Sequence, residues 1–262
     1  MTNKILMRLI ALVLGLLFLE ILIIHSKNEQ QKSVSNQVQT ARIMANGDLL
    51  YHDGLYMSAL QADGSYDFTE NFTYVKPWLK QADLVLGDFE GTINPDYPLS
   101  GYPLFNAPQS VTAAISDAGY DVMDLAHNHI LDSGLEGAFT TADAFKEVGI
   151  DPVGVYENPV RDKAPLFIKN VNGIKVAILS YAYGFNGLES NLTEKEIANH
   201  LSNLDEKRMK VEIERAEKEA DVTVIMPQMG VEYRLEPTDE QVKLYHKMID
   251  WGADIIFGGH PH

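Results

Sequence analysis

Metal-competent side chains follow four short apolar runs of this sequence, each with the composition of a β-strand. They are the carboxylates of Asp48, Asp88 and Glu90, the amide of Asn128, and the imidazoles of His260 and His262. Imidazole, carboxylate and amide ligands together suit Mn, Zn or Fe better than an all-oxygen calcium site. One or two such divalent ions would clamp a phosphoryl oxygen and generate hydroxide from water, which is the chemistry of metal-assisted hydrolysis.

The segment DLAHNHILDSG, residues 124–134, also contains candidates for proton transfer. His129 follows the expected ligand Asn128 and would protonate a leaving group or stabilise a transition state. Asp132 would orient that imidazole, because a neighbouring carboxylate fixes the tautomer of a histidine ring. The alternative interpretation is a hydrogen-bonded surface loop, and for His127 a supporting or structural role is the better explanation.

The elements that must position these residues alternate between strands and helices. Apolar runs, helical spacing and Pro or Gly signals predict strands at 83–91 and 221–228, and helices at 68–82 (interrupted or kinked at Pro77), 107–119, 134–148, 205–219 and 239–251. Asn172 and Gly173, between two apolar runs, predict a β-hairpin. This pattern is typical of a layered α/β domain whose mostly parallel strands share one carboxyl edge. We therefore expect the candidate residues to converge at that edge.

The composition excludes several classes of partner and chemistry. The chain carries 21 Lys and Arg against 37 Asp and Glu, a formal net charge of −16. This balance argues against nucleic acid as a partner, because phosphate backbones are bound by Lys and Arg. Cysteine is absent, which excludes disulfides, thiolate zinc sites and a cysteine nucleophile. Any bound metal must therefore be held by His, Asp, Glu or Asn.

The N-terminal segment has the composition of a membrane span. Residues 5–24 are almost continuously apolar, which is the length of one bilayer-spanning helix. Because no small-residue cleavage site follows, we expect an uncleaved signal anchor over 1–24. Lys4 and Arg8 favour a cytoplasmic N-terminal flank. The polar residues 25–40 then read as a tether, and the expected protein is a single-pass cell-membrane protein with an extracytoplasmic C-terminal domain.

A family resemblance is carried by five motifs in order: NGD, ADLVLGDFEGTI, DLAHNHILDSG, MGVEYRLEPTDEQ and GADIIFGGHPH. Together they resemble the bacterial capsule-synthesis CapA/PgsA family, which is associated with poly-γ-glutamate or capsule production and is similar to the calcineurin-like metallophosphatase superfamily. The resemblance implies a metallophosphatase-like layered α/β sandwich over 41–262, which we expect to be incomplete at its C-terminus. It also implies metal roles for Asp48, Glu90 or Asp88, Asn128, His260 and His262, with His129 as the catalytic-type histidine.

The sequence departs from the family pattern at three places in the expected cleft. Gln228 stands where the family often has a histidine, two residues before the Gly of the G-x-E-Y motif that contains Glu232. His127 replaces the first Asn of the frequent NNH motif, and Asp48 is not followed by the superfamily's Asp-x-His histidine. We expect His127, Gln228 and Glu232 to line the cleft. A site with one ion, with two ions, or without catalytic activity remains compatible with these departures.

Two functional hypotheses follow from the resemblance. The first is a membrane-anchored, extracytoplasmic protein that acts in the synthesis, export or attachment of a capsule polymer, with metal-assisted hydrolysis or transfer at its cleft. The second is a non-catalytic scaffold subunit of a membrane capsule-synthase complex. Both imply the membrane, the capsule polymer and synthase or export subunits as partners. They differ in whether His129 is required.

Overall fold

The computed structural model describes residues 19–25 and 38–260, and contacts divide the chain into two units, Met1–Thr40 and Ala41–His262. In the first unit, residues 19–25 form a helix and residues 38–40 have no regular secondary structure. Within the described residues, no helix combines the length and apolar character needed to cross a bilayer. Residues 1–18 of the expected membrane span and residues 26–37 of the expected tether lie outside the described residues, so both remain predictions.

The first sheet of the second unit is entirely parallel, with strand order β1-β2-β3-β4. Its strands are β1 (Ile43–Leu50), β2 (Leu84–Glu90), β3 (Val122–Asp124) and β4 (Asp151–Val153). The helices α4 (Val111–Ala118) and α5 (Gly134–Glu147) contribute to the core on one face of this sheet, where Phe89 meets Phe145 with ring centroids 5.1 Å apart. All seven residues of β2 are buried, as expected for a central parallel strand.

The second sheet has strand order β5-β6-β7-β8 and contains one antiparallel pair. Its strands are β5 (Ile168–Val171), β6 (Ile174–Ala182), β7 (Val222–Gln228) and β8 (Ile255–Ile256). The predicted hairpin joins β5 to β6, with positive φ angles of 54° at Asn172 and 89° at Gly173. Helices α7 (Glu206–Glu219) and α8 (Asp239–Trp251) cover the outer face, where Met209, Ile213 and Met248 are fully buried.

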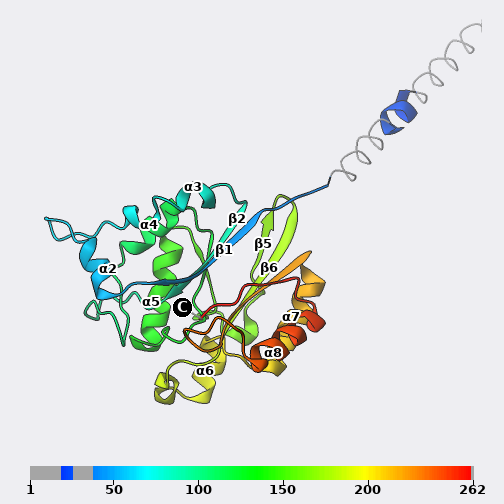
Figure 1. Cartoon of the computed structure of the whole chain (residues 1–262). Coiled ribbons are helices and arrows are strands. Elements are labelled where there is room, and N and C mark those ends of the chain that lie inside the picture. Colours follow the sequence, from blue (N-terminus) through cyan, green and yellow to red (C-terminus); the bar gives the residue numbers. More distant parts are fainter. Residues whose placement is uncertain (1–18, 26–37, 261–262) are drawn as a thin grey trace, which may run out of the picture. The chain divides into compact units, whose positions relative to one another are not determined.

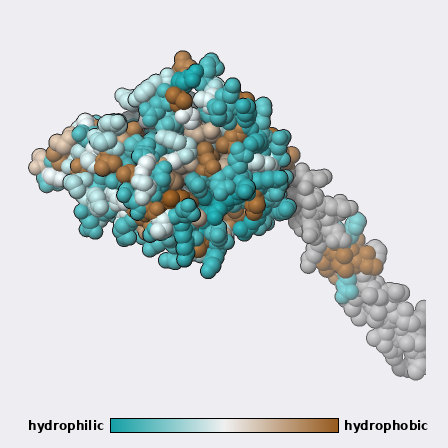
Figure 2. All heavy atoms as spheres, turned by 90° about the horizontal axis from the view of Figure 1, so that it is seen from below, coloured by the Kyte–Doolittle hydropathy of each residue, from teal (hydrophilic) through white to brown (hydrophobic). Residues whose placement is uncertain are grey.

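The inner faces of the two sheets share one apolar core. Leu86 and Val122 of the first sheet lie in the same buried cluster as Ile178 and Val224 of the second. The second unit is therefore a four-layer α/β/β/α sandwich, which confirms the layered α/β expectation (Figure 1). On the face shown in Figure 2, apolar side chains are scattered among hydrophilic ones, which is normal for a solvent-facing surface.

The remaining elements are short and connect the sandwich at its edges. They are α2 (Asp53–Ser58), η1 (Thr69–Phe72), α3 (Lys76–Leu79), η2 (Arg161–Lys163), η3 (Leu188–Asn191) and α6 (Glu194–His200). The helix expected over 68–82, interrupted or kinked at Pro77, consists of two separate elements, η1 and α3, and the break lies before Pro77. Pro77 lies in the first turn of α3, where its missing N–H costs nothing, so it begins a helix instead of kinking one. Pro108 lies before α4, and its carbonyl oxygen accepts a turn hydrogen bond from Val111 N, the first residue of that helix.

A capping box at the start of α8 provides a first prediction. Gln241 N donates to Thr238 Oγ1 at 3.2 Å, and Thr238 N donates to Gln241 Oε1 at 2.8 Å. We expect Thr238→Ala to lower the free energy of unfolding by about 1 kcal/mol, because a helix-end donor loses its acceptor. Urea unfolding measures the change. Thr73→Ala, at an exposed threonine, is the matched control and should stay within about 0.5 kcal/mol of the parent; equal losses in both variants would contradict the capping argument.

Candidate metal centre

The carboxyl edge of the first sheet brings three aspartates side by side. In the parallel register Asp48 of β1 lies opposite Asp88 of β2, and Asp88 lies opposite Asp124 of β3. Between Ala45 and Asp48 the register of β1 shifts by one residue relative to β2, which is a β-bulge. Such a bulge re-aims the side chains that follow it, so the sequence ANGD both ends the apolar run and turns Asp48 toward its neighbours. Asp88 and Asp124 are buried.

The loop after β3 joins the first sheet to the second through amide groups. Asn128 N donates to Gln228 Oε1 at 2.9 Å, and Gln228 Nε2 donates to Asn128 Oδ1 at 2.9 Å. Asn128 Nδ2 in turn donates to Asn186 Oδ1 at 3.2 Å. Gln228 is the last residue of β7, so two residues 100 positions apart meet at the same edge. Asn128 and Gln228 are both buried, and each hydrogen bond is therefore strong and costly to leave unmade.

His129 and Asp132 form a second group at this edge. Asp132 Oδ2 lies 2.7 Å from His129 Nδ1 and accepts a hydrogen bond from Phe105 N at 2.6 Å. The carboxylate therefore places the ring proton on Nδ1. In the neutral ring the lone pair is then on Nε2. His129 Nε2 lies 4.0 Å from Glu90 Oε1, so that nitrogen faces the acidic cluster. The edge-on packing of Phe105 against the His129 ring, with centroids 4.8 Å apart, fixes the ring plane further.

The GGH motif that follows β8 lies against the carboxylates. A Cβ added at Gly259 would lie 3.2 Å from Asp88 Oδ2 and 3.5 Å from Asp48 Oδ1. A larger residue here would press its Cβ against the Asp88 carboxylate, so glycine suits this close approach of the chain. His260 is buried with φ of 89°, which is rare for a non-glycine residue, and its Nε2 lies 4.0 Å from Glu232 Oε1. His262 lies outside the described residues, so its role as a metal ligand remains a prediction.

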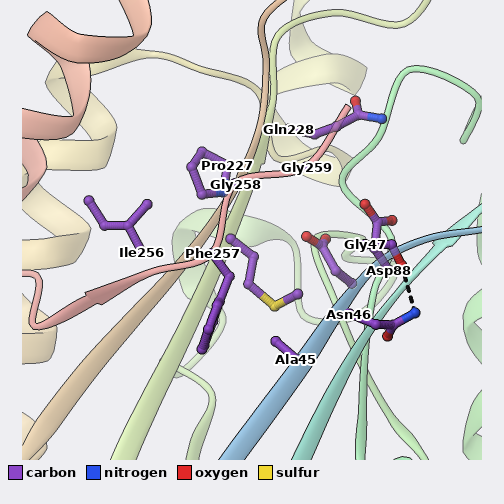
Figure 3. A pocket seen from close by; sticks show the side chains of 12 residues that line it. Ala45, Asn46, Gly47, Asp88, Pro227, Gln228, Ile256, Phe257, Gly258 and Gly259 are labelled. Atoms are coloured by element: carbon purple, nitrogen blue, oxygen red, sulfur yellow. Dashed lines mark hydrogen bonds between the residues drawn. The ribbon is translucent and has the colours of Figure 1, made fainter. Parts of the chain in front are cut away.

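A cavity of about 270 Å³ opens beside this edge. Its polar wall includes Asp88, Asp124 and Gln228, and its apolar wall includes Met226 and Phe257. Figure 3 shows labelled residues of β1 and β2 together with residues from the end of β7, from β8 and from the segment that follows β8. The cavity therefore lies between strand ends of both sheets, next to the acidic cluster.

Burial and mutual repulsion govern the electrostatics of the carboxyl cluster. Burial raises the pKa of Glu90 to about 9, and Asp48 adds to the rise. Burial also raises the pKa of Asp124 to about 8. For Asp88, burial raises the pKa well above its ordinary value, and the neighbouring Asp124 and Asp48 reinforce it. Buried carboxylates this close to one another must take up protons or a cation.

The raised pKa values of these carboxyls predict that the folding stability of the protein depends on pH in the presence of EDTA. In the unfolded chain these carboxyls titrate at their ordinary values, 4.5 for Glu90 and 3.8 for Asp124, so between those values and the raised ones the folded state holds more protons. The stabilisation that these carboxyls contribute is therefore fully present below about pH 4. It is lost as the pH rises toward about 9. Thermal unfolding from about pH 5 to about pH 9 tests this, and Glu90→Gln should show a shallower loss. A parent and variant with parallel curves would contradict it.

The carboxyl side of the site offers ligand types that suit a divalent cation. The carboxyl side offers buried oxygens of adjacent strands, and these are ligands that Mn, Zn and Fe accept. On the amide side, the Asn128 oxygen already accepts a hydrogen bond from Gln228. Among the described residues, no three His, Asp or Glu side chains stand in the arrangement of a complete metal site.

The structure brings most of the expected residues together and adds others. Asp48, Asp88, Asn128, His129, Gln228 and His260 are linked by the contacts above, and Glu90 and Glu232 lie beside the two histidines. His127 is fully buried, and its Nδ1 accepts a hydrogen bond from His129 N at 3.2 Å, which suits a supporting role. Sequence reasoning missed Asp124 and Asn186. Asp124 ends a strand-like run, so the search for polar residues at strand ends could have identified it. Nothing in the turn GFNG indicates a functional role for Asn186.

A comparison with solved structures identifies a protein with a similar fold. The structure is similar to that of a putative 5'-nucleotidase from Staphylococcus aureus, solved in complex with alpha-ketoglutarate, with a TM-score of 0.53 and 16% sequence identity. The match covers 85% of this chain and 46% of that one. At this identity the likeness shows the fold alone, a layered α/β sandwich that the two proteins share.

The sequence comparisons show the family. Residues 42–262 match the family described as bacterial capsule synthesis protein PGA_cap, and the chain belongs to this family. It is 34% identical over 200 residues to the capsule biosynthesis protein CapA of Bacillus anthracis, covering 73% of this chain and 48% of that protein. It is 28% identical over 265 residues to the PGA biosynthesis protein CapA of Bacillus subtilis (strain 168), covering 100% of this chain and 67% of that protein. The chain thus spans about half to two thirds of the length of these relatives.

Proposed function

We propose that this chain is a membrane-anchored, extracytoplasmic component of capsule or poly-γ-glutamate synthesis or export, with a divalent-cation site that supports hydrolysis or transfer at a phosphoester or amide linkage. The observation that carries the proposal is the convergence of Asp48, Asp88, Asn128, His129 and the Gly259–His260 motif at one edge of the sandwich. Membership of the capsule synthesis family supplies the biological setting.

The residues that would hold the cation are the carboxylates of Asp48, Asp88 and Glu90, together with the imidazoles of His260 and His262. A bound Mn, Zn or Fe ion supplies Lewis acidity and lowers the pKa of water. The chain's own groups handle the proton. Asp132 holds the Nδ1 proton of His129, so Nε2 is the atom that exchanges a proton with the leaving group. The buried walls around Glu90 and His129 limit the access of bulk water.

The membrane anchor and the partners are part of the same proposal. The apolar residues 5–24 would anchor the protein, and residues 25–40 would hold the domain away from the bilayer. A chain with a net charge of −16 repels a polyanionic capsule polymer unless cations intervene. A cation at the carboxyl edge would therefore help this surface to approach such a polymer or its synthase and export subunits.

The test combines metal analysis with turnover of a generic phosphodiester. We expect the parent protein to retain bound metal and to hydrolyse the ester, and His260→Ala and His262→Ala to lose both properties. His246→Ala, at an exposed histidine of α8, is the matched control and should behave as the parent. A metal-free parent protein with the same turnover as the two variants would defeat the enzymatic form of the proposal.

The hydrogen bond from Gln228 to Asn128 favours a second candidate, a non-catalytic scaffold of a membrane synthase complex. In this hydrogen bond Gln228 Nε2 donates to Asn128 Oδ1, the oxygen that would ligate the metal in the catalytic form of the site. In this case deletion of residues 1–24 abolishes capsule in cells, whereas His129→Ala leaves capsule intact. Loss of capsule through the His129 change alone counts against the scaffold.

A further inference from the structure

We propose that a ligand reaches the two histidines of the site, His129 and His260, across the turn formed by residues 183–187, here called the outer turn. In this turn the side chain of Asn186 covers the first histidine and that of Tyr183 covers the second. This inference rests on the proposed function, since it names the residues that a substrate of the proposed site would meet first. The outer turn directly follows β6.

The outer turn is fastened both to the second sheet and to the core. Tyr183 N donates to Gln228 O at 3.0 Å, which continues the pairing of β6 with β7. Phe185 is 2% exposed and packs in the core beneath. Asn186 and Gly187 then reverse the chain with φ of 53° and 81°, in the left-handed region that asparagine and glycine tolerate best. The turn therefore presents its side chains at defined positions on the carboxyl edge.

The orientation of the Asn186 amide follows from a backbone group. Asn128 N can only donate, so the Gln228 atom 2.9 Å from it is Oε1, and Gln228 Nε2 then donates to Asn128 Oδ1. Asn128 Nδ2 donates in turn to Asn186 Oδ1 at 3.2 Å. Asn186 Nδ2 therefore faces the His129 ring, at 3.4 Å from Nδ1 and 3.5 Å from Nε2. These nearly equal distances place the amide against the ring and not in line with the lone pair of either nitrogen.

Asn186 lies on the solvent side of the His129 ring. Phe105 and Asp132, which also contact this ring, are buried, whereas Asn186 is exposed. His129 itself is only 8% exposed. A ligand that approaches this imidazole from solvent therefore meets the Asn186 amide, whose N–H groups can donate to it.

Tyr183 has the corresponding place at His260. The two ring centroids lie 4.8 Å apart, with an angle of 46° between the ring planes. His260 is 4% exposed and Tyr183 is 45% exposed, so the tyrosine ring has one side on the histidine and another toward solvent. A tyrosine in this place offers a ligand apolar contact area together with a hydroxyl. The outer turn thus puts an amide and an aromatic ring on the path to the two histidines.

The test measures how fast a small neutral reagent reaches each histidine. The full chain in EDTA is treated with diethyl pyrocarbonate, which modifies the unprotonated ring nitrogen of histidine, and tandem mass spectrometry of peptides gives the rate at each position. Asn186→Gly removes the amide while glycine keeps the positive φ without strain. We expect this variant to show a several-fold faster modification of His129 and the parent rate at His260. Tyr183→Ala should show the converse.

Asn172→Gly is the matched control, because Asn172 is exposed, has φ of 54° and lies in the hairpin between β5 and β6. It should leave the rates at His129 and His260 unchanged, and a rise there equal to that in the outer-turn variants overturns the inference. A histidine that keeps its parent rate when its own cover is removed overturns it as well.

A further histidine reports on the fold of the variants. His127 is fully buried, so its modification in Tyr183→Ala signals a loss of the fold, and the Asn186→Gly result then decides the inference. Because the protein is kept in EDTA and no turnover is measured, these outcomes do not depend on whether the proposed hydrolysis occurs. Absence of bound metal or of turnover in the test of the proposed function is thus a separate result.

Discussion

Replacing Arg161 by alanine is expected to lower the free energy of unfolding by about 3 kcal/mol or more, because it leaves the carboxylate of Glu212 without its cationic partner. Arg161 Nε and Nη2 donate to the two carboxylate oxygens of Glu212 at 3.0 and 2.8 Å. Its Nη1 donates to Leu201 O at 3.0 Å, and the hydroxyl of the buried Tyr181 donates to Glu212 Oε2 at 2.9 Å. The guanidinium side chain is 1% exposed, so water cannot take over these contacts.

Urea unfolding of matched variants measures this effect. Arg215→Ala removes an exposed pair with Glu219 and should change the free energy of unfolding by less than about 1 kcal/mol. Replacing both Arg161 and Glu212 by methionine should recover part of the loss, because no uncompensated carboxylate then stays behind. Similar decreases in the free energy of unfolding for Arg161→Ala and Arg215→Ala would contradict the prediction, because they would show that the buried Arg161–Glu212 pair stabilises the protein no more than an exposed pair.

Asp88→Asn is expected to weaken Mn²⁺ binding by at least about 100-fold, more than the loss of an outer partner of a metal ligand would produce. Asp88 lies between Asp48 and Asp124 in the sheet register and is buried. The amide keeps the shape of the side chain but removes the charge that attracts the ion. It also relieves repulsion among the neighbouring carboxyls, so the variant in EDTA should be at least as stable as the parent.

Calorimetric titration with Mn²⁺ and thermal unfolding in EDTA measure both parts of that expectation. The control is Asp117→Asn, where an exposed carboxylate pairs with Lys76 on the surface. It should leave Mn²⁺ affinity unchanged. Retention of the parent affinity in a folded Asp88→Asn protein would place any bound ion elsewhere in the chain.

Local sequence signals predicted local structure well in this protein. Asn172 and Gly173 adopt positive φ angles in the hairpin, as the dipeptide implies, and Gly119 ends α4 with φ of 109°. These outcomes depend on the conformational preferences of one or two residues. The interruption expected in 68–82 is present, but it lies before Pro77, because proline favours the first turn of a helix and so begins α3.

By itself, the sequence determined which metal-competent residues lie near the carboxyl ends of the strands, the alternation that makes a layered α/β unit, and the family to which the chain belongs. Only the tertiary structure decided what each group at the edge touches. Gln228 and Asn128 are 100 residues apart, and their hydrogen bonds depend on how one sheet packs on the other. The same packing brings Gly259 against Asp48 and Asp88 and adds Asn186 to the site. Strand ends can be recognised locally, whereas the partners of a buried polar group are set by the elements that the core brings together.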